Sequence, residues 1–540
     1  MRRGVALMFV LAAASGVAAA ARAEEGSSGV AAAIAARLTA DPAPPLDGIP
    51  LDVALLRAVY APRAHAPLWP SGRAAAAAAA LRDAPSHGLD ATAYHVGAIE
   101  RRLGAGDDEV AAERDLLLSD AVMRFAVDLH AGAVVPRRWS SEVALDARPA
   151  DPVALLLATS LAADPAAYLA ALAPRASAYQ RLREALARYR EIARRGGWPA
   201  IPDGPSLAPG ASDAAVALVR RRLHATGELP ADTPLGSTSY DPALVAAVKT
   251  FQADNGLTAD GVIGRGTRVA LGVSAEARIA QMVANLERWR WMPDDLGAKH
   301  VRVNVPGYWL EVIEDGNTAL AMPVVVGRPD RRTPMFSSRI TQLVFNPSWT
   351  IPQKLAREDM LPRARRNPGY FAAKGIQVYS GWSAGAAAVD STGVDWGTVG
   401  SGIAGLKLRQ PPGPGNPLGR VKFQIPNGYD VYLHDTNAKG LMSRPQRAQS
   451  SGCVRLGDAL GLAGRLLADW TPERRAALTR SWQTRTVTLE EPVPVHLVYE
   501  TVWMDAEGRV HFREDIYGRD AALVKAIEAA ARRGRVMAET

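Results

Sequence analysis

The spacing of apolar residues along the chain changes once between its first and last parts. Between residues 50 and 195, apolar positions recur every three or four residues in segments rich in Ala, Leu and Arg, for example from Leu116 to Leu129. From about residue 300 the spacing becomes two, interrupted by Gly, Pro and Asn. The chain therefore predicts helices first and a sheet-rich domain later.

A Pro- and Gly-rich segment from Trp198 to Pro209 separates the first helical region from a short second one. Ser212-Asp213 is typical of a helix N-terminus. Apolar residues at helical spacing then predict two helices, over residues 216–223 and 244–251. These two helices would enclose a small core of their own.

Within the strand region, the alternation stops between about Ile351 and Pro426, where the chain is rich in Gly, Pro and Ala. A loop of that length inside a compact domain is usually functional. We expect a lid or capping insertion over a site. Alternation returns around residues 430–434, which predicts that Tyr432 and His434 point to the same face of a strand.

The amino terminus has the pattern of an export signal. Two arginines precede an uncharged run from Gly4 to Ala21, and Ala21-Arg22-Ala23 has the small-x-small form of a cleavage site. A signal peptide is therefore expected over residues 1–23. Because the run is long enough to span a bilayer, an uncleaved anchor is the alternative. After cleavage, no further membrane span is predicted, and the mature chain would be exported to the periplasm.

Length and charge narrow the class of protein. A chain of 540 residues suggests about three or four domains. The formal net charge of +8 falls to +5 when the three arginines of the signal leave. That mild basicity suits an anionic envelope surface, but the positive charges are scattered and form no aromatic-interleaved stripe, so nucleic acid is not a predicted partner.

The chain contains one cysteine, Cys453, so it cannot form an internal disulfide. An exported lone thiol is a candidate nucleophile. It follows Ser450-Ser451-Gly452, and the apolar spacing after Leu456 predicts a helix. Cys453 is therefore expected near a helix N-terminus, where the dipole and free amides would favour a thiolate.

His434 is the candidate base. A thiol needs a base within hydrogen-bond reach to ionise and to return a proton to an amine. The imidazole must itself be held, and either a backbone carbonyl near Asp435 or the Asp435 carboxylate could do so. Gly452 leaves room for substrate, and the amides of Gly452 and Cys453 could face a developing oxyanion.

Two stretches carry a resemblance to known families. Residues 251–264, with Gly256 and Gly261 suited to tight turns, resemble the small three-helix peptidoglycan-binding module found beside many cell-wall enzymes. The histidine strand, the run Ser450 to Arg455 and the strands expected between Val301 and Val326 resemble the catalytic domain of L,D-transpeptidases, which is of the YkuD type. They are most similar to the long-chain branch, which also carries a helical scaffold domain.

The resemblance implies a multidomain α+β protein. Its expected parts are a helical scaffold domain at 45–200, a peptidoglycan-binding module at 210–273, a β-rich catalytic domain at 299–480 with the capping insertion at 351–426, and a C-terminal extension at 481–540.

The resemblance also implies a reaction without metal or cofactor. Cys453 would attack the carbonyl that joins the third residue of a peptidoglycan tetrapeptide stem to D-Ala, and His434 would protonate the leaving amine. A neighbouring stem would then resolve the thioester into a 3→3 cross-link. Donor and acceptor stems are the expected partners, and reaction of the same thiol with carbapenem β-lactams is implied.

The chain departs from the wider family at two positions. Many members have Gly where this chain has Asp435 and His where it has Ser451. Ser450, Ser451 and Gly452 are candidates for binding substrate or the oxyanion. Tyr432 could contribute a hydroxyl to the site or pack beside His434, and Arg455 could hold a stem carboxylate or cap local structure.

Other functions stay open at this stage. Water as the acceptor would give an L,D-carboxypeptidase, and a free D-amino acid would give an exchange enzyme. A cell-wall cysteine endopeptidase is disfavoured because that exported class places cysteine before histidine. A non-catalytic peptidoglycan-binding protein is the third class. Tryptophans beside the site motifs, namely Trp289, Trp291 and Trp349, are expected in the core rather than stacked on sugars.

Overall fold

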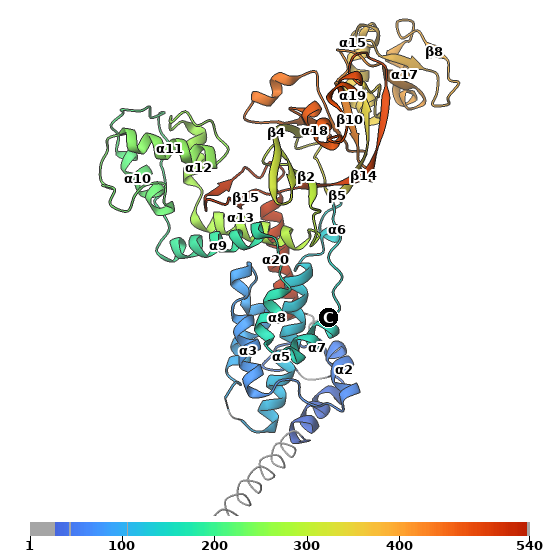
Figure 1. Cartoon of the computed structure of the whole chain (residues 1–540). Helices are drawn as coiled ribbons and strands as arrows, with labels where there is room; N and C mark the ends of the chain where they lie inside the picture. Colours follow the sequence, from blue (N-terminus) through green and yellow to red (C-terminus); the bar gives the residue numbers. More distant parts are fainter. Residues whose placement is uncertain (1–27, 43–44, 105, 537–540) are drawn as a thin grey trace, which may run out of the picture. The chain divides into compact units, whose positions relative to one another are not determined.

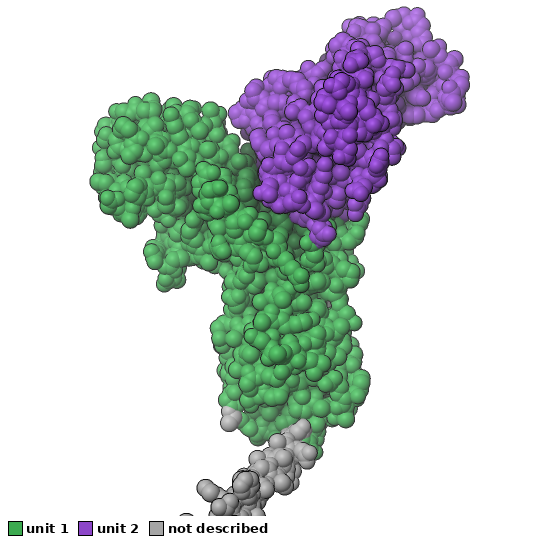
Figure 2. All heavy atoms as spheres, viewed as in Figure 1, with its two compact units in different colours: residues 1–141, 145–294, 501–540 green, residues 142–144, 295–500 purple. Residues whose placement is uncertain are grey.

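The computed structural model describes residues 28–42, 45–104 and 106–536 (Figure 1). The expected signal peptide at 1–23 lies outside the described residues. The chain divides into two compact units, one comprising residues 1–141, 145–294 and 501–540 and the other residues 142–144 and 295–500 (Figure 2). Within the described residues, no helix has the length and apolar character needed to cross a membrane.

The first unit begins with the predicted helical region. Several of its helices start at an aspartate whose carboxylate accepts backbone N–H groups of the first turn, at Asp52, Asp107, Asp151 and Asp164. Its main helices are α2 (Val53–Tyr60), α3 (Ser71–Arg82), α5 (Asp108–Ala131), α7 (Pro152–Leu161), α8 (Pro165–Ala171) and α9 (Ser177–Arg194).

Three further helices of this unit surround a separate small core. They are α10 (Ala214–Thr226), α11 (Pro242–Asp254) and α12 (Arg265–Gly272). Asp213 caps α10, as the sequence predicted, by accepting the N–H of Ala215. Gly256 and Gly261 have φ values of +69° and +76°, which glycine adopts without strain. The core consists of buried side chains that include Val216, Val219, Leu223, Leu244, Val248 and Phe251.

The first unit is completed by segments from two distant parts of the chain. Helix α13 (Ala275–Arg290) precedes the second unit, whereas α20 (Arg519–Val536) and the hairpin of β15 (Val502–Met504) and β16 (Val510–Phe512) follow it. Trp289 and Trp291 are buried, as expected.

The second unit is built on one large sheet. Its strands are β1 (Val143–Ala144), β2 (Lys299–Asn304), β3 (Trp309–Glu314), β4 (Asn317–Gly327), β5 (Met335–Phe345), β10 (Val421–Gln424), β11 (Leu433–His434), β12 (Ala448–Ser450), β13 (Val454–Leu456) and β14 (Arg485–Val498). The order runs β1-β5-β10-β11-β13-β4-β3-β2-β14, with β12 beside β4. Because β14 also pairs with β5, the ring of strands closes on itself.

The expected C-terminal extension at 481–540 is not one body. Strand β14 pairs with β2 and β5 in the sheet of the second unit, whereas residues 501–540 belong to the first unit. Residues 481–540 are divided between the two units because β14 pairs with strands far away in the sequence, and the local spacing of residues does not predict such pairing.

The segment expected to be a capping insertion is folded rather than a long loop. A four-stranded sheet has the order β6 (Trp349–Thr350), β9 (Lys407–Gln410), β7 (Gln377–Tyr379) and β8 (Ala388–Val389). The helices are α14 (Gln353–Leu355), a π-helical turn η4 (Ala356–Met360), α15 (Leu361–Arg366), α16 (Tyr370–Ala373) and α17 (Trp396–Val399). Phe371 and Trp396 meet in its own core, with ring centroids 4.6 Å apart.

Candidate active site

Cys453 lies in the short turn between β12 and β13, with a half-buried side chain. Gly452 precedes it with φ of +116°, a conformation that side chains rarely adopt. The Ser450 hydroxyl accepts the Gly452 N–H at 3.1 Å and donates to the Cys453 carbonyl at 2.6 Å. Thr333 Oγ1 donates to the Gly452 carbonyl at 2.7 Å. These contacts fix the backbone on which the thiol stands.

The structure corrects the expected helix N-terminus at Cys453. The residues that follow it form strand β13, and the next helix, α18 (Ala459–Leu466), begins only after that strand. Burial raises the pKa of the Cys453 thiol. Hydrogen bonds from the backbone and hydroxyl of Tyr432, with the positive charges of Lys422 and Arg455, oppose that rise. Nearby side chains, rather than a helix dipole, therefore support the thiolate.

The fixed turn also corrects part of the oxyanion expectation. Because the Gly452 N–H already donates to Ser450, it is not free to bind an oxyanion. Of the two amides named from the sequence, only that of Cys453 is left for this role.

His434 stands on β11, beside the strand that follows Cys453. In the sheet it pairs with Lys422 of β10 on one side and with Arg455 of β13 on the other. Its Nδ1 lies 2.5 Å from the Asp435 carbonyl oxygen. Because a carbonyl can only accept, Nδ1 carries the proton and Nε2 keeps its lone pair. Burial, followed by the charge of Arg455, lowers the pKa of His434 to about 3, so the ring is neutral near pH 7.

Asp435 therefore holds the imidazole through its backbone carbonyl. Its carboxylate is engaged elsewhere, with Lys439 Nζ at 2.5 Å and the Arg420 N–H at 2.8 Å. Of the two possibilities that the sequence left open, the structure shows the carbonyl.

Tyr432 contributes its hydroxyl as well as packing. Its ring centroid lies 5.5 Å from that of His434, which confirms that the two side chains share a face. Burial, followed by the neighbouring Cys453 thiol, raises the pKa of the Tyr432 hydroxyl, and the indole of Trp349 opposes that rise. Trp349, on β6, is half-buried and packs against the apolar core of the insertion, in line with the expectation for this residue.

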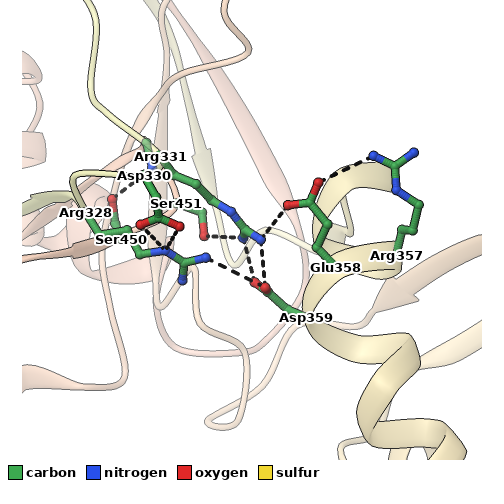
Figure 3. Close-up of polar contacts among 9 residues, drawn as sticks. Arg328, Asp330, Arg331, Arg357, Glu358, Asp359, Ser450 and Ser451 are labelled. Atoms are coloured by element: carbon green, nitrogen blue, oxygen red, sulfur yellow. Dashed lines mark hydrogen bonds and ion pairs between the residues drawn. The ribbon is translucent and has the colours of Figure 1, made fainter.

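Ser451 is engaged by a charged network that the sequence did not reveal (Figure 3). Arg331, in the loop between β4 and β5, donates to Ser451 Oγ at 3.1 Å. The same guanidinium donates to Asp359 at 2.6 and 2.7 Å and to Glu358 at 2.8 Å, both on the π-helical turn η4. The only sequence signal was a dense run of charge, Arg328 to Arg332, between two apolar strands.

Two cationic side chains lie near the thiol, Arg455 and Lys422, and only Arg455 was predicted from the sequence as a site residue. Arg455 was a candidate, and the structure gives its half-buried guanidinium no hydrogen-bond partner among the described residues. Lys422 was missed as a site residue, although β10 places its Nζ 4.0 Å from the centre of the Tyr432 ring. In the part of the chain that the structure describes, no cluster of three His, Cys, Asp or Glu side chains could hold a metal ion.

Three protein-family models match successive parts of the chain. A model described as "Scaffold domain" matches residues 54–186, and one described as "Putative peptidoglycan binding domain" matches residues 212–271. A model of the L,D-transpeptidase catalytic domain matches residues 298–493, which include Cys453 and His434. Residues 298–493 are an L,D-transpeptidase catalytic domain. Through this domain the chain is similar to L,D-transpeptidases.

One curated relative and two solved structures are similar to the chain. A protein of Haemophilus influenzae named "Putative L,D-transpeptidase" is 36% identical over 253 residues, which cover 46% of this chain and 50% of that protein. The chain thus spans about half the length of this relative. L,D-transpeptidases from Xylanimonas cellulosilytica and Stackebrandtia nassauensis are each 16% identical, with TM-scores of 0.18 and 0.21. They cover 55% and 56% of this chain, and 99% and 96% of their own chains are matched. TM-scores at this level carry no weight for the site.

Proposed function

We propose that this protein is an L,D-transpeptidase that forms 3→3 cross-links in peptidoglycan through a thioester on Cys453, with release of D-Ala. The observation that carries the proposal is the pairing of β11 with β13, Leu433 with Val454, which sets Cys453 beside the segment that presents a neutral His434. A neutral imidazole with Nε2 unprotonated can take a proton from a thiol.

The acylation step follows from these groups. His434 Nε2 takes the thiol proton, and the Cys453 sulfur attacks the carbonyl carbon between the third residue of the donor stem and D-Ala. The Cys453 N–H donates to the oxyanion that forms. The C–N bond then breaks, the D-Ala amine leaves with the proton from His434, and a thioester stays on Cys453.

The second step reverses the direction of proton transfer. The side-chain amine of an acceptor stem attacks the thioester while His434 Nε2 accepts its proton. The C–S bond breaks, the new amide completes the 3→3 link, and the proton returns to the Cys453 sulfur. An insertion that excludes water from the thioester would favour the amine over hydrolysis.

The remaining parts of the chain fit a cell-wall location. We infer that residues 212–271 bind peptidoglycan, and that the chain is exported to the periplasm by its N-terminal signal. Support comes from the family description of the module and from the charge and apolar pattern before Glu24. Acylation of Cys453 by carbapenems belongs to the same proposal, since it needs only the same thiolate.

The test is mass spectrometry of purified tetrapeptide muropeptides incubated with the wild type, Cys453→Ala and His434→Gln. We expect the wild type to yield a dimer with a 3→3 bond and one D-Ala per link, and both variants to lose at least about 100-fold in rate. Release of D-Ala without a dimer would replace transpeptidation by carboxypeptidase or exchange activity. No turnover in any of the proteins would leave peptidoglycan binding as the function.

A further inference from the structure

Ionisation of the Cys453 thiol requires nearby positive potential, and no helix N-terminus of the described residues supplies it at Cys453. Strand β13 follows Cys453 directly, and burial works against ionisation of the sulfur. The Val454 N–H donates to the Tyr432 carbonyl at 3.1 Å and Leu433 pairs with Val454, so Tyr432 lies beside Cys453. The Tyr432 hydroxyl is the side-chain donor that lowers the pKa of the thiol. Whatever makes Tyr432 a stronger donor therefore stabilises the thiolate form of Cys453.

Lys422 is placed to do this. It stands on β10 directly opposite His434 of β11, so its side chain emerges on the face that carries Tyr432 and His434. Its ammonium nitrogen lies 4.0 Å from the centre of the Tyr432 ring, well inside the range of a cation–π contact. The side chain is half-buried, and the structure gives its ammonium no ion pair within the described residues.

We propose that Lys422 is a positioning residue for the nucleophile: its ammonium, resting on the Tyr432 ring, strengthens the hydrogen bond from the Tyr432 hydroxyl to the Cys453 sulfur. A cation on the face of the ring withdraws electron density from the phenol, which makes its O–H a better donor to a thiolate. Lys422 and Tyr432 keep their own protons throughout. The thiol proton passes to His434 Nε2 or to solvent base.

Other charged groups face the same sulfur and must be separated from Lys422 in any test. Arg455 of β13 adds positive charge, and Asp430, whose carbonyl oxygen lies 3.9 Å from the sulfur, adds negative charge near Lys422. His434 is neutral near pH 7 and adds none. Arg455 and Asp430 are unchanged when Lys422 alone is replaced, so a matched series at position 422 isolates its effect.

The experiment measures alkylation of the full chain by iodoacetamide as a function of pH. With one cysteine in the sequence, every alkylation event reports Cys453. We expect Lys422→Met to raise the pH midpoint of alkylation by about one unit, which is a tenfold lower rate on the acid side of the midpoint. Lys422→Arg should restore the midpoint to within about 0.3 units.

The chain offers a matched control in Lys407, whose ammonium lies 5.8 Å from the centre of the Tyr379 ring in the insertion. Lys407→Met removes a lysine from a tyrosine ring away from the thiol and should leave the midpoint unchanged. Thermal melts of each variant check folding, and Lys422→Gln replaces Lys422→Met if that variant is unfolded. A midpoint unchanged in a folded Lys422→Met or Lys422→Gln protein overturns the proposal.

A second comparison tests the route through Tyr432. In a Tyr432→Phe background the hydroxyl is gone, so replacing Lys422 should shift the midpoint by less than half of its effect in the wild type. An undiminished shift overturns the route through the hydroxyl. The inference rests on the proposed function only for the role of Cys453 as nucleophile. Because alkylation needs no muropeptide, a protein that shows the shift but no turnover refutes the proposed function alone.

Discussion

At the residue scale, the proposed base of this site is a histidine that stays neutral. Burial lowers the pKa of His434 to about 3, and the Asp435 carbonyl fixes its proton on Nδ1. A base acts in its deprotonated form, which His434 holds at every pH well above 3. The site therefore begins as a thiol beside a neutral imidazole rather than as a preformed ion pair, and proton transfer accompanies attack.

This arrangement predicts the pH dependence of D-Ala release. Between pH 5 and 8, kcat/KM should stay level and show no break near 6.5, where an unperturbed histidine titrates, because the thiol and the neutral imidazole that react are both present throughout. The measurement is a pH–rate profile on tetrapeptide muropeptide for the wild type. A break between pH 6 and 7 that disappears in His434→Gln would contradict the prediction, because it would show that His434 titrates there.

At the element scale, one guanidinium joins the catalytic turn to the insertion. Arg331 is largely buried and bonds Ser451, two residues before Cys453, as well as both carboxylates of the π-helical turn η4. π-helical turns are frequent at functional sites, where they place side chains that a regular helix would not. The insertion is thereby held against the turn that carries the nucleophile.

Removing the Arg331 guanidinium should destabilise both the turn that carries Cys453 and the insertion. We expect Arg331→Met to lower the free energy of unfolding of the second unit by ~1–3 kcal/mol, since charge-assisted hydrogen bonds to three partners are lost. We also expect faster proteolysis within residues 351–426 and at least about a tenfold fall in kcat/KM. Arg328→Met is the matched control, because Arg328 forms ion pairs with Asp330 and Asp359 but, within the described residues, its guanidinium has no hydrogen bond to Ser451. Equal effects of the two variants would mean that the loop's charge, and not the link to Ser451, matters.

At the scale of the whole molecule, the binding module and the catalytic domain are separate cores. The module encloses its own apolar residues, whereas the thiol and the imidazole belong to the second unit. A substitution that unfolds the module should therefore abolish binding to the insoluble wall without slowing the turnover of soluble fragments.

Phe251, which is 1% exposed in the module core, provides the test. Phe251→Asp buries an unpaired charge and should unfold the module, at a cost of several kcal/mol. We expect the variant to lose co-sedimentation with purified sacculi but to keep kcat/KM on soluble muropeptides within about threefold. Thr250→Asp adds the same charge at the exposed neighbouring position of α11 and should leave both properties unchanged. Loss of sacculus binding in neither variant would argue against the module as the binding element.

The sequence by itself determined the local structure and named the candidate pair of site residues. Helical spacing predicted the helices of the first unit and the two helices around residues 216–251, and alternation predicted the strands from Val301 to Val326. These patterns succeed because each depends on neighbours within a few residues. A lone cysteine after Ser-Ser-Gly, with a histidine upstream on a strand, was likewise enough to name Cys453 and His434.

Only the tertiary structure decided what surrounds that pair. The parallel pairing of β11 with β13 placed a strand between Cys453 and the helix expected after Leu456, and β10 brought Lys422 onto the Tyr432 ring. Arg331 and Trp349 reach the site from segments far from Cys453 in the chain. Such contacts arise from strand pairing and folding over long sequence separations, and the spacing of residues along one segment carries no record of them.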